Sequence, residues 1–240
     1  YALHNWPGLP AGKIGLRPGP TMAAADRVTI HIEGRGGHGA HPHAAIDPVV
    51  VAAHIIVAAQ SIVSRGINPI DTAVISLCHI NAGHQDAMSV IPREARIVGT
   101  VRTFKQETQD FIEQRLAQLV SSIATAFGAR ATLHFERVYP ATVNTERESE
   151  FARDVAVALV GEENVVWNLD PSMGSEDFSF MLQKKPGCYL RLAEIIAMTD
   201  DDAIIRLDQG GINARDITDL LMDDHGGTVL RGSRLGAHQV

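Results

Sequence analysis

The sequence predicts an α/β protein in which one contiguous segment carries strands and helices in the order βαββαβ. Two observations support this class. Four short stretches between residues 27 and 137 are β-branched or alternate apolar with polar side chains, which is typical of strands. Two longer stretches in the same segment are apolar or repeat apolar residues at helical intervals. This order indicates one four-stranded sheet with both helices on one face, the ferredoxin-like pattern.

The first strand and the first helix of this segment have clear sequence signals. Residues 28–32 alternate between apolar and polar side chains and predict a half-buried strand. Asp47 and Pro48 predict a helix start, because Asp is favoured at the N-cap and Pro at the first helical position. The helix is expected over the apolar residues 49–63, with Gly66 as its stop.

The second half of the segment repeats the scheme. Strands are expected at 73–80 and 96–102. Thr103 and Gln106 have the spacing of a capping box, which predicts that Thr103 caps the next helix. Apolar residues then recur at helical spacing at Ile112, Leu116, Leu119, Ile123 and Phe127. Gly128 is expected to end this helix.

A fourth strand and a second region follow. Residues 131–135 alternate and complete the sheet. Beyond residue 138 we expect a helix over 146–160, short strands at 165–167 and 189–192, and a glycine-centred acidic turn at 172–178.

Composition excludes several classes of function. The chain has 240 residues and a formal net charge of −7, so a general nucleic-acid surface is not expected. No apolar run approaches the roughly 20 residues of a membrane span, and we see no signal peptide. Cys78 and Cys188 form no disulfide framework and indicate a cytoplasmic protein. Because the chain opens with Tyr1 inside an apolar phrase, we expect a piece of a longer protein.

Two histidine-bearing stretches are candidates for chemistry. The phrase GRGGHGAHPH holds His38, His41 and His43 among glycines, which suit a backbone that passes close to a ligand. A solvated turn explains the same pattern equally well. His4, in ALHNWPG, is placed either to bind a metal through a neutral ring nitrogen or to form an ordinary loop hydrogen bond.

Charged residues on other elements also leave alternatives open. Arg102, in GTVRTF, is either a surface arginine or a bidentate clamp for a carboxylate. Glu176 and Asp177 are either general acid/base groups or acids favoured at a helix N-terminus. The sequence contains no phosphate-binding loop, GxSxG, CxxC or HExxH motif.

Taken together, several phrases resemble the amidohydrolase branch of the M20 metallopeptidase family, which includes hippurate hydrolases and N-acyl-amino-acid aminoacylases. These phrases are ALHNWPGLPAGKIGLRPGPTMAAADR, GRGGHGAHPHAAIDPVVVAA, SVIPREARIVGTVRTF, YPATVN and PSMGSEDFSFML. The resemblance extends from Tyr1 to about Leu192.

The resemblance implies a lid, or dimerisation, domain at 27–137 inserted into a partial α/β catalytic domain at 1–26 and 138–192. It implies metal-dependent hydrolysis of the amide bond of N-acyl amino acids by a water held between two divalent ions (Zn, Mn, Co or Ni). It also implies a homodimer formed through the lid. Residues 193–240 resemble nothing in the family.

Individual residues match the family motifs. By resemblance, His4 is a metal ligand, His38 is a catalytic lid residue that supports the oxyanion, and Arg102 holds the substrate carboxylate. Ser89 occupies the position of a usual asparagine in a lid contact to substrate. The residues expected to support the site from behind the ligands are Gly174, Ser175, Glu176 and Asp177.

The family's Cys-x-His and Glu-Glu motifs would lie before Tyr1, and its last metal histidine would follow Leu192, where the chain diverges. We therefore expect this chain to be inactive alone. Two alternatives are a non-catalytic dimerisation or binding module and a split enzyme whose missing half is a separate chain.

Overall fold

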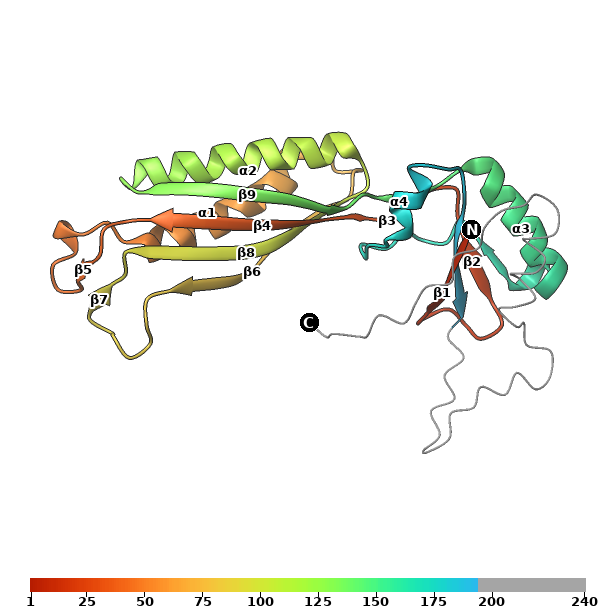
Figure 1. The fold of residues 1–240 in the computed structure, drawn as a ribbon, viewed down its shortest axis with the longest axis horizontal. Coiled ribbons are helices and arrows are strands. Elements are labelled where there is room, and N and C mark those ends of the chain that lie inside the picture. The colour runs from red at the N-terminus through yellow and green to blue at the C-terminus, as the bar shows by residue number, and fades with distance from the viewer. Residues whose placement is uncertain (194–240) are drawn as a thin grey trace, which may run out of the picture. The chain divides into compact units, whose positions relative to one another are not determined.

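A computed structural model describes residues 1–193, which form two compact units (Figure 1). Of the described residues, unit 1 contains Tyr1–Met22, Thr142–Ser172 and 176–193, whereas unit 2 contains Ala23–Ala141 and Met173–Ser175. The sequence placed these boundaries at 26/27 and 137/138, four residues away at each end. Apart from its first residue, the divergent segment 193–240 lies outside the described residues.

Unit 2 has the predicted ferredoxin-like topology. Its elements are β4 (Ala24–Glu33), β5 (Gly37–His38), α1 (Pro48–Ser61), β6 (Ala73–Ala82), β7 (Val90–Ile91), β8 (Glu94–Thr103), α2 (Gln106–Ala126) and β9 (Arg130–Tyr139). The main sheet has the order β6-β8-β4-β9, and every neighbouring pair is antiparallel. A short antiparallel ladder between β5 and β7 lies outside this sheet and was not expected from the sequence.

Both helices of unit 2 pack on the same face of the sheet. Val28, Ile30 and Ile32 alternate along β4 and are fully buried in one apolar cluster. The same cluster takes in residues of both helices, namely Val51, Ala52, Ile55 and Ala59 of α1 and Ile112, Leu116, Val120 and Ala124 of α2. Each large apolar side chain buried in this way contributes about 1.5–3 kcal/mol, so this shared face holds the layers together.

The start of α1 is as predicted, but the start of α2 is not. The Asp47 carboxylate accepts a hydrogen bond from the Val49 amide at 2.8 Å, which satisfies one free amide of the first helical turn. At α2 the N-cap is Lys105, and the predicted Thr103–Gln106 capping box is wrong. Thr103 is the last residue of β8 and pairs with Ala24 of β4. Its backbone therefore belongs to the strand and cannot also begin the helix.

The helix that begins at Pro48 is longer than the sequence predicted for any apolar run. It continues beyond α1 as a wider turn, Ile62–Gly66. Among residues 1–193, this continuous helix is the one that is long and apolar enough to cross a membrane by length and composition. The sequence had predicted no run approaching that length. One side of the helix is nevertheless part of the core of unit 2.

Unit 1 contains a smaller mixed sheet. Its elements are β1 (Ala2–Trp6), β2 (Ile14–Leu16), β3 (Gly19–Met22), β10 (Thr142–Asn144), α3 (Glu146–Val160), β11 (Val165–Trp167), α4 (Phe178–Leu182) and β12 (Tyr189–Ala193). The sheet order is β1-β12-β2-β11, with β1 parallel to β12 and β2 parallel to β11. The bounds of α3 and β11 are those predicted from the sequence.

Helix α3 covers one face of this sheet and leaves the polar candidates on the other. Ile14, Leu16 and Leu190 cluster with Ala152 and Ala156 of α3. Because strand side chains alternate, the opposite face of β1 and β12 carries His4, Trp6, Tyr189 and Arg191.

Candidate functional site

His4 is the candidate metal ligand of unit 1, and its ring has one free nitrogen. Its Nδ1 contacts the Asn5 carbonyl, which can only accept a hydrogen bond. Nδ1 therefore carries the proton, and Nε2 keeps a free lone pair. A histidine whose second nitrogen is fixed by a carbonyl is the usual form of a metal ligand in proteins.

A complete metal site is not formed by the described part of the chain. Among residues 1–193 no group of three or more His, Cys, Asp or Glu side chains is arranged to hold a metal ion. Catalytic zinc sites use three protein ligands, and a second ion needs more. His4 thus fits the role of one ligand, and the remaining ligands of a two-metal centre are not found among residues 1–193.

The side chain of Tyr189 lies between Glu176 and His4 in unit 1 and contacts both. The Tyr189 hydroxyl donates to Glu176 Oε2 at 2.9 Å, and the Tyr189 and His4 rings are 6.4 Å apart. Burial raises the pKa of Glu176, the neighbouring Asp177 raises it further, and the bond from Tyr189 opposes the rise. Glu176 is thus a carboxyl group with increased proton affinity, and the Tyr189 side chain separates it from the candidate metal ligand.

Asp177 lies at the start of helix α4. It is the N-cap residue of α4, and its side chain makes no capping hydrogen bond. An acid at a helix N-terminus is favoured by the helix dipole, which is the simpler of the two interpretations given above.

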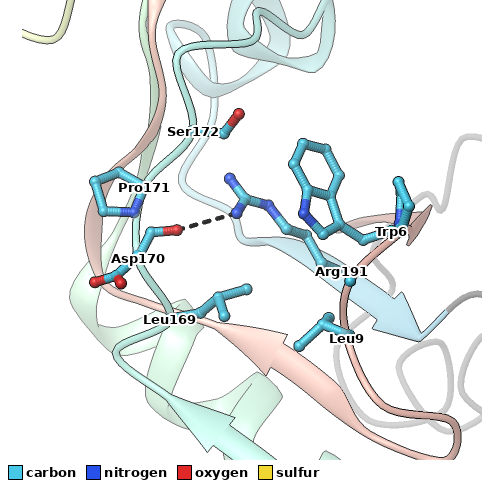
Figure 2. A pocket seen from close by; sticks show the side chains of 9 residues that line it. Trp6, Leu9, Leu169, Asp170, Pro171, Ser172 and Arg191 are labelled. Carbon is cyan, nitrogen blue, oxygen red and sulfur yellow. Dashed lines mark hydrogen bonds between the residues drawn. The ribbon is translucent and has the colours of Figure 1, made fainter.

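A cavity of about 340 Å³ lies at the end of β1, and its lining includes Trp6 and Arg191 (Figure 2). The Arg191 side chain extends along its wall, with its guanidinium carbon 4.2 Å from the centre of the Trp6 ring. Arg191 is 2% exposed and donates to the backbone carbonyls of Asp170 at 3.1 Å and Thr21 at 2.6 Å. Arg191 therefore ties β12 to strand β3 and to the loop at Asp170, and sequence reasoning did not find it.

In unit 2, the histidine-rich loop is folded back on the segment around Ser89. His38 pairs with Val90 in the β5–β7 ladder, and the Gly39 amide donates to the Ser89 carbonyl at 2.7 Å. A Cβ at Gly34 would lie 2.2 Å from the Ile46 carbonyl oxygen, so the chain can fold here only with glycine. The structure thus places Ser89 near His38 along the chain pairing. The contact between the two segments is made by the Ser89 backbone carbonyl and not by its hydroxyl.

The exposed ring of His38 is prepared to donate a hydrogen bond. Its Nδ1 accepts the Ala40 amide at 3.1 Å. In the neutral ring the proton is then on Nε2, which is left as a hydrogen-bond donor. The ring centre of His41 lies 5.6 Å from that of His38, and the ring centre of His43 lies 6.1 Å from that of His41.

Arg102 is held from two sides. Its Nε–H donates to Thr100 Oγ1 at 3.1 Å and its Nη1–H donates to Ser175 Oγ at 3.2 Å. Among residues 1–193 no carboxylate lies within ion-pair distance of this guanidinium. Gly174, beside Ser175, accepts the Ala23 amide at 2.9 Å. The turn that the sequence singled out therefore supports Arg102.

Sequence reasoning missed Thr100 and Tyr189. Thr100 is two residues before Arg102 on a strand, so both side chains share one face of the sheet, and this signal was available. A buried tyrosine needs a partner for its hydroxyl, but nothing local indicated Glu176 as that partner.

The fold and the site define a two-domain α/β protein in which a ferredoxin-like domain interrupts a mixed-sheet domain that carries a candidate metal ligand. Residues 24–126 match a family model described as a peptidase dimerisation domain, of the M20 type. A hippurate hydrolase from Campylobacter jejuni is 39% identical over 79% of this chain and 49% of its own length. An N-acetyl-L-cysteine deacetylase from Bacillus subtilis is 38% identical over 78% of this chain and 44% of its own length.

Solved structures agree with these relatives. The YXEP protein of Bacillus subtilis, described as a dinuclear metal binding peptidase from the M20 family, has a TM-score of 0.64 and 30% identity. The match covers 80% of this chain and 48% of that one. The chain is similar to these M20 proteins over about four fifths of its own length, and it spans about half the length of the curated relatives it matches.

Proposed function

We propose that this chain is part of a metal-dependent amidohydrolase that hydrolyses the amide bond of N-acyl amino acids, with hippurate-like compounds as the substrate class. The hippurate hydrolase and the deacetylase among its relatives support the reaction type. The observation that carries the substrate class is Arg102, a cation fixed by Thr100 and Ser175 and without a carboxylate partner among residues 1–193. Its planar fork fits the free carboxylate of an N-acyl amino acid.

His38 is the second group proposed to act on substrate. Its ring is exposed, and the Nε2–H is suited to donate to the carbonyl oxygen as negative charge develops there. We propose that Ser89, whose carbonyl anchors the loop, helps to set the direction of that donor.

Two divalent metal ions (Zn, Mn, Co or Ni) are proposed as cofactors, with His4 Nε2 as one ligand. When bound, such ions polarise the scissile carbonyl and lower the pKa of a coordinated water. The relative described as a dinuclear metal binding peptidase supports this proposal. We propose that Glu176 and Tyr189 help to orient the His4 ring. Tyr189 donates a hydrogen bond to Glu176, and its ring lies beside that of His4.

We further propose a homodimer formed through unit 2, supported by the match to a dimerisation domain. The two free cysteines, Cys78 and Cys188, support a reducing compartment such as the cytoplasm. A second candidate function is a non-catalytic dimerisation module, which the compact unit 2 with its own core would suit.

A chimaeric enzyme tests the proposed function. Residues 23–141 and 173–175 of this chain would replace the aligned residues of the Campylobacter jejuni hippurate hydrolase. We expect a folded chimaera that hydrolyses hippurate and loses activity when a chelator removes the metal. A folded chimaera that binds metal but leaves hippurate and N-acetyl amino acids intact would favour the non-catalytic module.

A further inference from the structure

Arg191 is a buried cation of unit 1 that has no counter-charge in the described part of the chain. Its side chain is 2% exposed, and among residues 1–193 no carboxylate lies within ion-pair distance of its guanidinium. Burial of a charged group is costly unless an opposite charge or a full set of hydrogen bonds replaces the lost water. The surroundings of Arg191 are therefore a candidate site for an anion.

The hydrogen bonds of Arg191 leave part of its guanidinium unused. Of the five N–H groups that an arginine offers, one on Nη1 donates to the Asp170 carbonyl and one on Nη2 donates to the Thr21 carbonyl. The Nε atom is buried and has no hydrogen-bond partner. The face of the Trp6 ring attracts the cation but carries no net charge, so it offsets only part of the cost of burial. Two bonds to backbone carbonyls do not by themselves require a charged donor.

A second arginine adds positive charge at the same loop. Arg17 donates from Nη1 to the Leu169 carbonyl at 3.3 Å, one residue before the Asp170 carbonyl that Arg191 binds. The Arg17 Nε is also buried without a hydrogen-bond partner, and among residues 1–193 Arg17 forms no ion pair. Burial lowers the pKa of Arg191, Tyr189 opposes this shift, and Arg17 adds to it. The two cations together favour an anion beside Arg191.

The cavity at the end of β1 offers space for that anion. Figure 2 shows the Arg191 guanidinium between the Trp6 ring and the Asp170 carbonyl, while the Asp170 carboxylate points away from it. The volume of about 340 Å³ is within the range of small-molecule sites. Among the described residues that line the cavity, Arg191 is the single basic one. The apolar residues of the lining are Trp6, Pro7, Leu9, Leu169 and Pro171. One cation in a largely apolar wall fits a monoanion with an apolar body.

We propose that this cavity binds a small monocarboxylate with an aryl or alkyl body, and that its carboxylate pairs with Arg191. The planar guanidinium matches the geometry of a carboxylate, and the apolar body would cover the Leu9 and Leu169 side of the wall. A phosphate carries close to two charges at pH 7 and has no apolar part, so it fits this lining less well. The inference does not depend on the proposed hydrolysis, because the proposed reaction assigns no role to Arg191, Trp6 or Leu9.

Isothermal titration calorimetry of the 240-residue chain tests the proposal, with phenylacetate as the probe. The control is 2-phenylacetamide, which has nearly the same shape and no charge. We expect phenylacetate to bind at least about tenfold more tightly than the amide, because hydrogen bonds to a charged group are the stronger ones. Sodium phosphate at equal ionic strength should not displace phenylacetate. Absence of phenylacetate binding, equal affinity for the amide, or displacement by phosphate would each overturn the proposed ligand class.

Variants test the role of Arg191. Arg191→Gln removes the charge and should raise Kd for phenylacetate about 10–100-fold. Because Arg191 also ties β12 to β3, a second pair of variants leaves it in place. Leu9→Asp adds a carboxylate to the wall, and Leu9→Asn adds a group of the same size without charge. Leu9→Asp should bind phenylacetate at least about tenfold more weakly than Leu9→Asn, since its carboxylate repels the ligand or pairs with Arg191 itself. Circular dichroism would verify folding, and equal Kd values for the two Leu9 variants would reject the pairing.

Fluorescence locates the bound probe. The chain has two tryptophans, Trp6 and Trp167, and of these Trp6 lines the cavity. In Trp167→Phe, where Trp6 is the single tryptophan, phenylacetate should shift the emission, because the carboxylate changes the field of the cation that lies on the ring. In Trp6→Phe the emission of Trp167 should stay constant. A response of Trp167 together with a silent Trp6 would place the ligand elsewhere and reject the cavity.

Discussion

The Nε–H of Arg102 donates to Thr100 Oγ1 at 3.1 Å, and the Thr100 hydroxyl donates to the Asp26 carbonyl at 2.9 Å. This chain of two bonds connects the candidate carboxylate clamp to the central strand of the sheet. Arginine loses much rotamer freedom when it binds a ligand, so a side chain that is already held loses less.

Thr100 is therefore predicted to position Arg102. In the chimaeric hydrolase, Thr100→Val should raise KM for hippurate about tenfold and leave kcat within a factor of about two, because a hydrogen bond from a charged group contributes about 1.5–3 kcal/mol and Arg102 keeps its second bond, to Ser175. Thr100→Ser keeps the hydroxyl and should restore KM. Steady-state kinetics measures both values. Equal KM values for the Val and Ser variants would refute this role.

Arg102 itself is predicted to bind the substrate carboxylate. Arg102→Lys should raise KM for N-acyl amino acids about 10–100-fold, since bonds to charged groups contribute about 1.5–3 kcal/mol. The same variant should change KM little for the C-terminally amidated analogues, which have no carboxylate. The comparison of the two substrate series is the measurement, and parallel losses on both would reject the assignment.

His38 is predicted to act on substrate rather than on metal. His38→Ala in the chimaera should lower kcat about 10²–10³-fold, the loss typical of an oxyanion donor. The metal content, measured by mass spectrometry of the purified enzyme, should stay at the parental value. A loss of metal together with activity would instead make His38 a ligand.

The 240-residue chain alone is predicted not to hydrolyse N-acyl amino acids. Among residues 1–193 no group of three or more His, Cys, Asp or Glu side chains is arranged to hold a metal ion, and His4 as one imidazole cannot hold two ions at useful affinity. Purified chain would be assayed with hippurate and N-acetyl amino acids in the presence of Zn²⁺, Mn²⁺ or Co²⁺. Turnover that a chelator abolishes and that survives repurification would show a ligand set not found here.

The buried Asp26 is predicted to make unit 2 less stable as pH rises. Burial raises the pKa of Asp26, and the bonds from Gln109 oppose this only in part. The folded state therefore holds more protons than the unfolded state between the ordinary aspartate pKa of 3.8 and the raised pKa, so the stability that protonation adds is lost as pH increases through this window.

Asp26→Asn removes this titration. Its free energy of unfolding relative to wild type should increase with pH through the same window and then level off. Urea unfolding followed by circular dichroism at several pH values measures this difference. Curves that remain parallel across the window would contradict the assignment.

Local signals in the sequence were sufficient for most of unit 2. The alternation at residues 28–32 and the Asp47-Pro48 pair reflect interactions between near neighbours, and both predicted the observed elements. Thr103 shows where this approach fails. Its spacing to Gln106 favoured a cap, but pairing with Ala24, far away along the chain, extended the strand through Thr103.

The sequence by itself determined the βαββαβ order and the candidate residues His4, His38 and Arg102, because periodicity and short motifs are properties of adjacent residues. Only the tertiary structure decided that Arg102 meets Ser175 and that Tyr189 meets Glu176. It also decided that Val57 remains on the surface, although it lies in a largely apolar helix. Such contacts depend on where the folded chain brings together residues distant in sequence, and no local pattern contains that information.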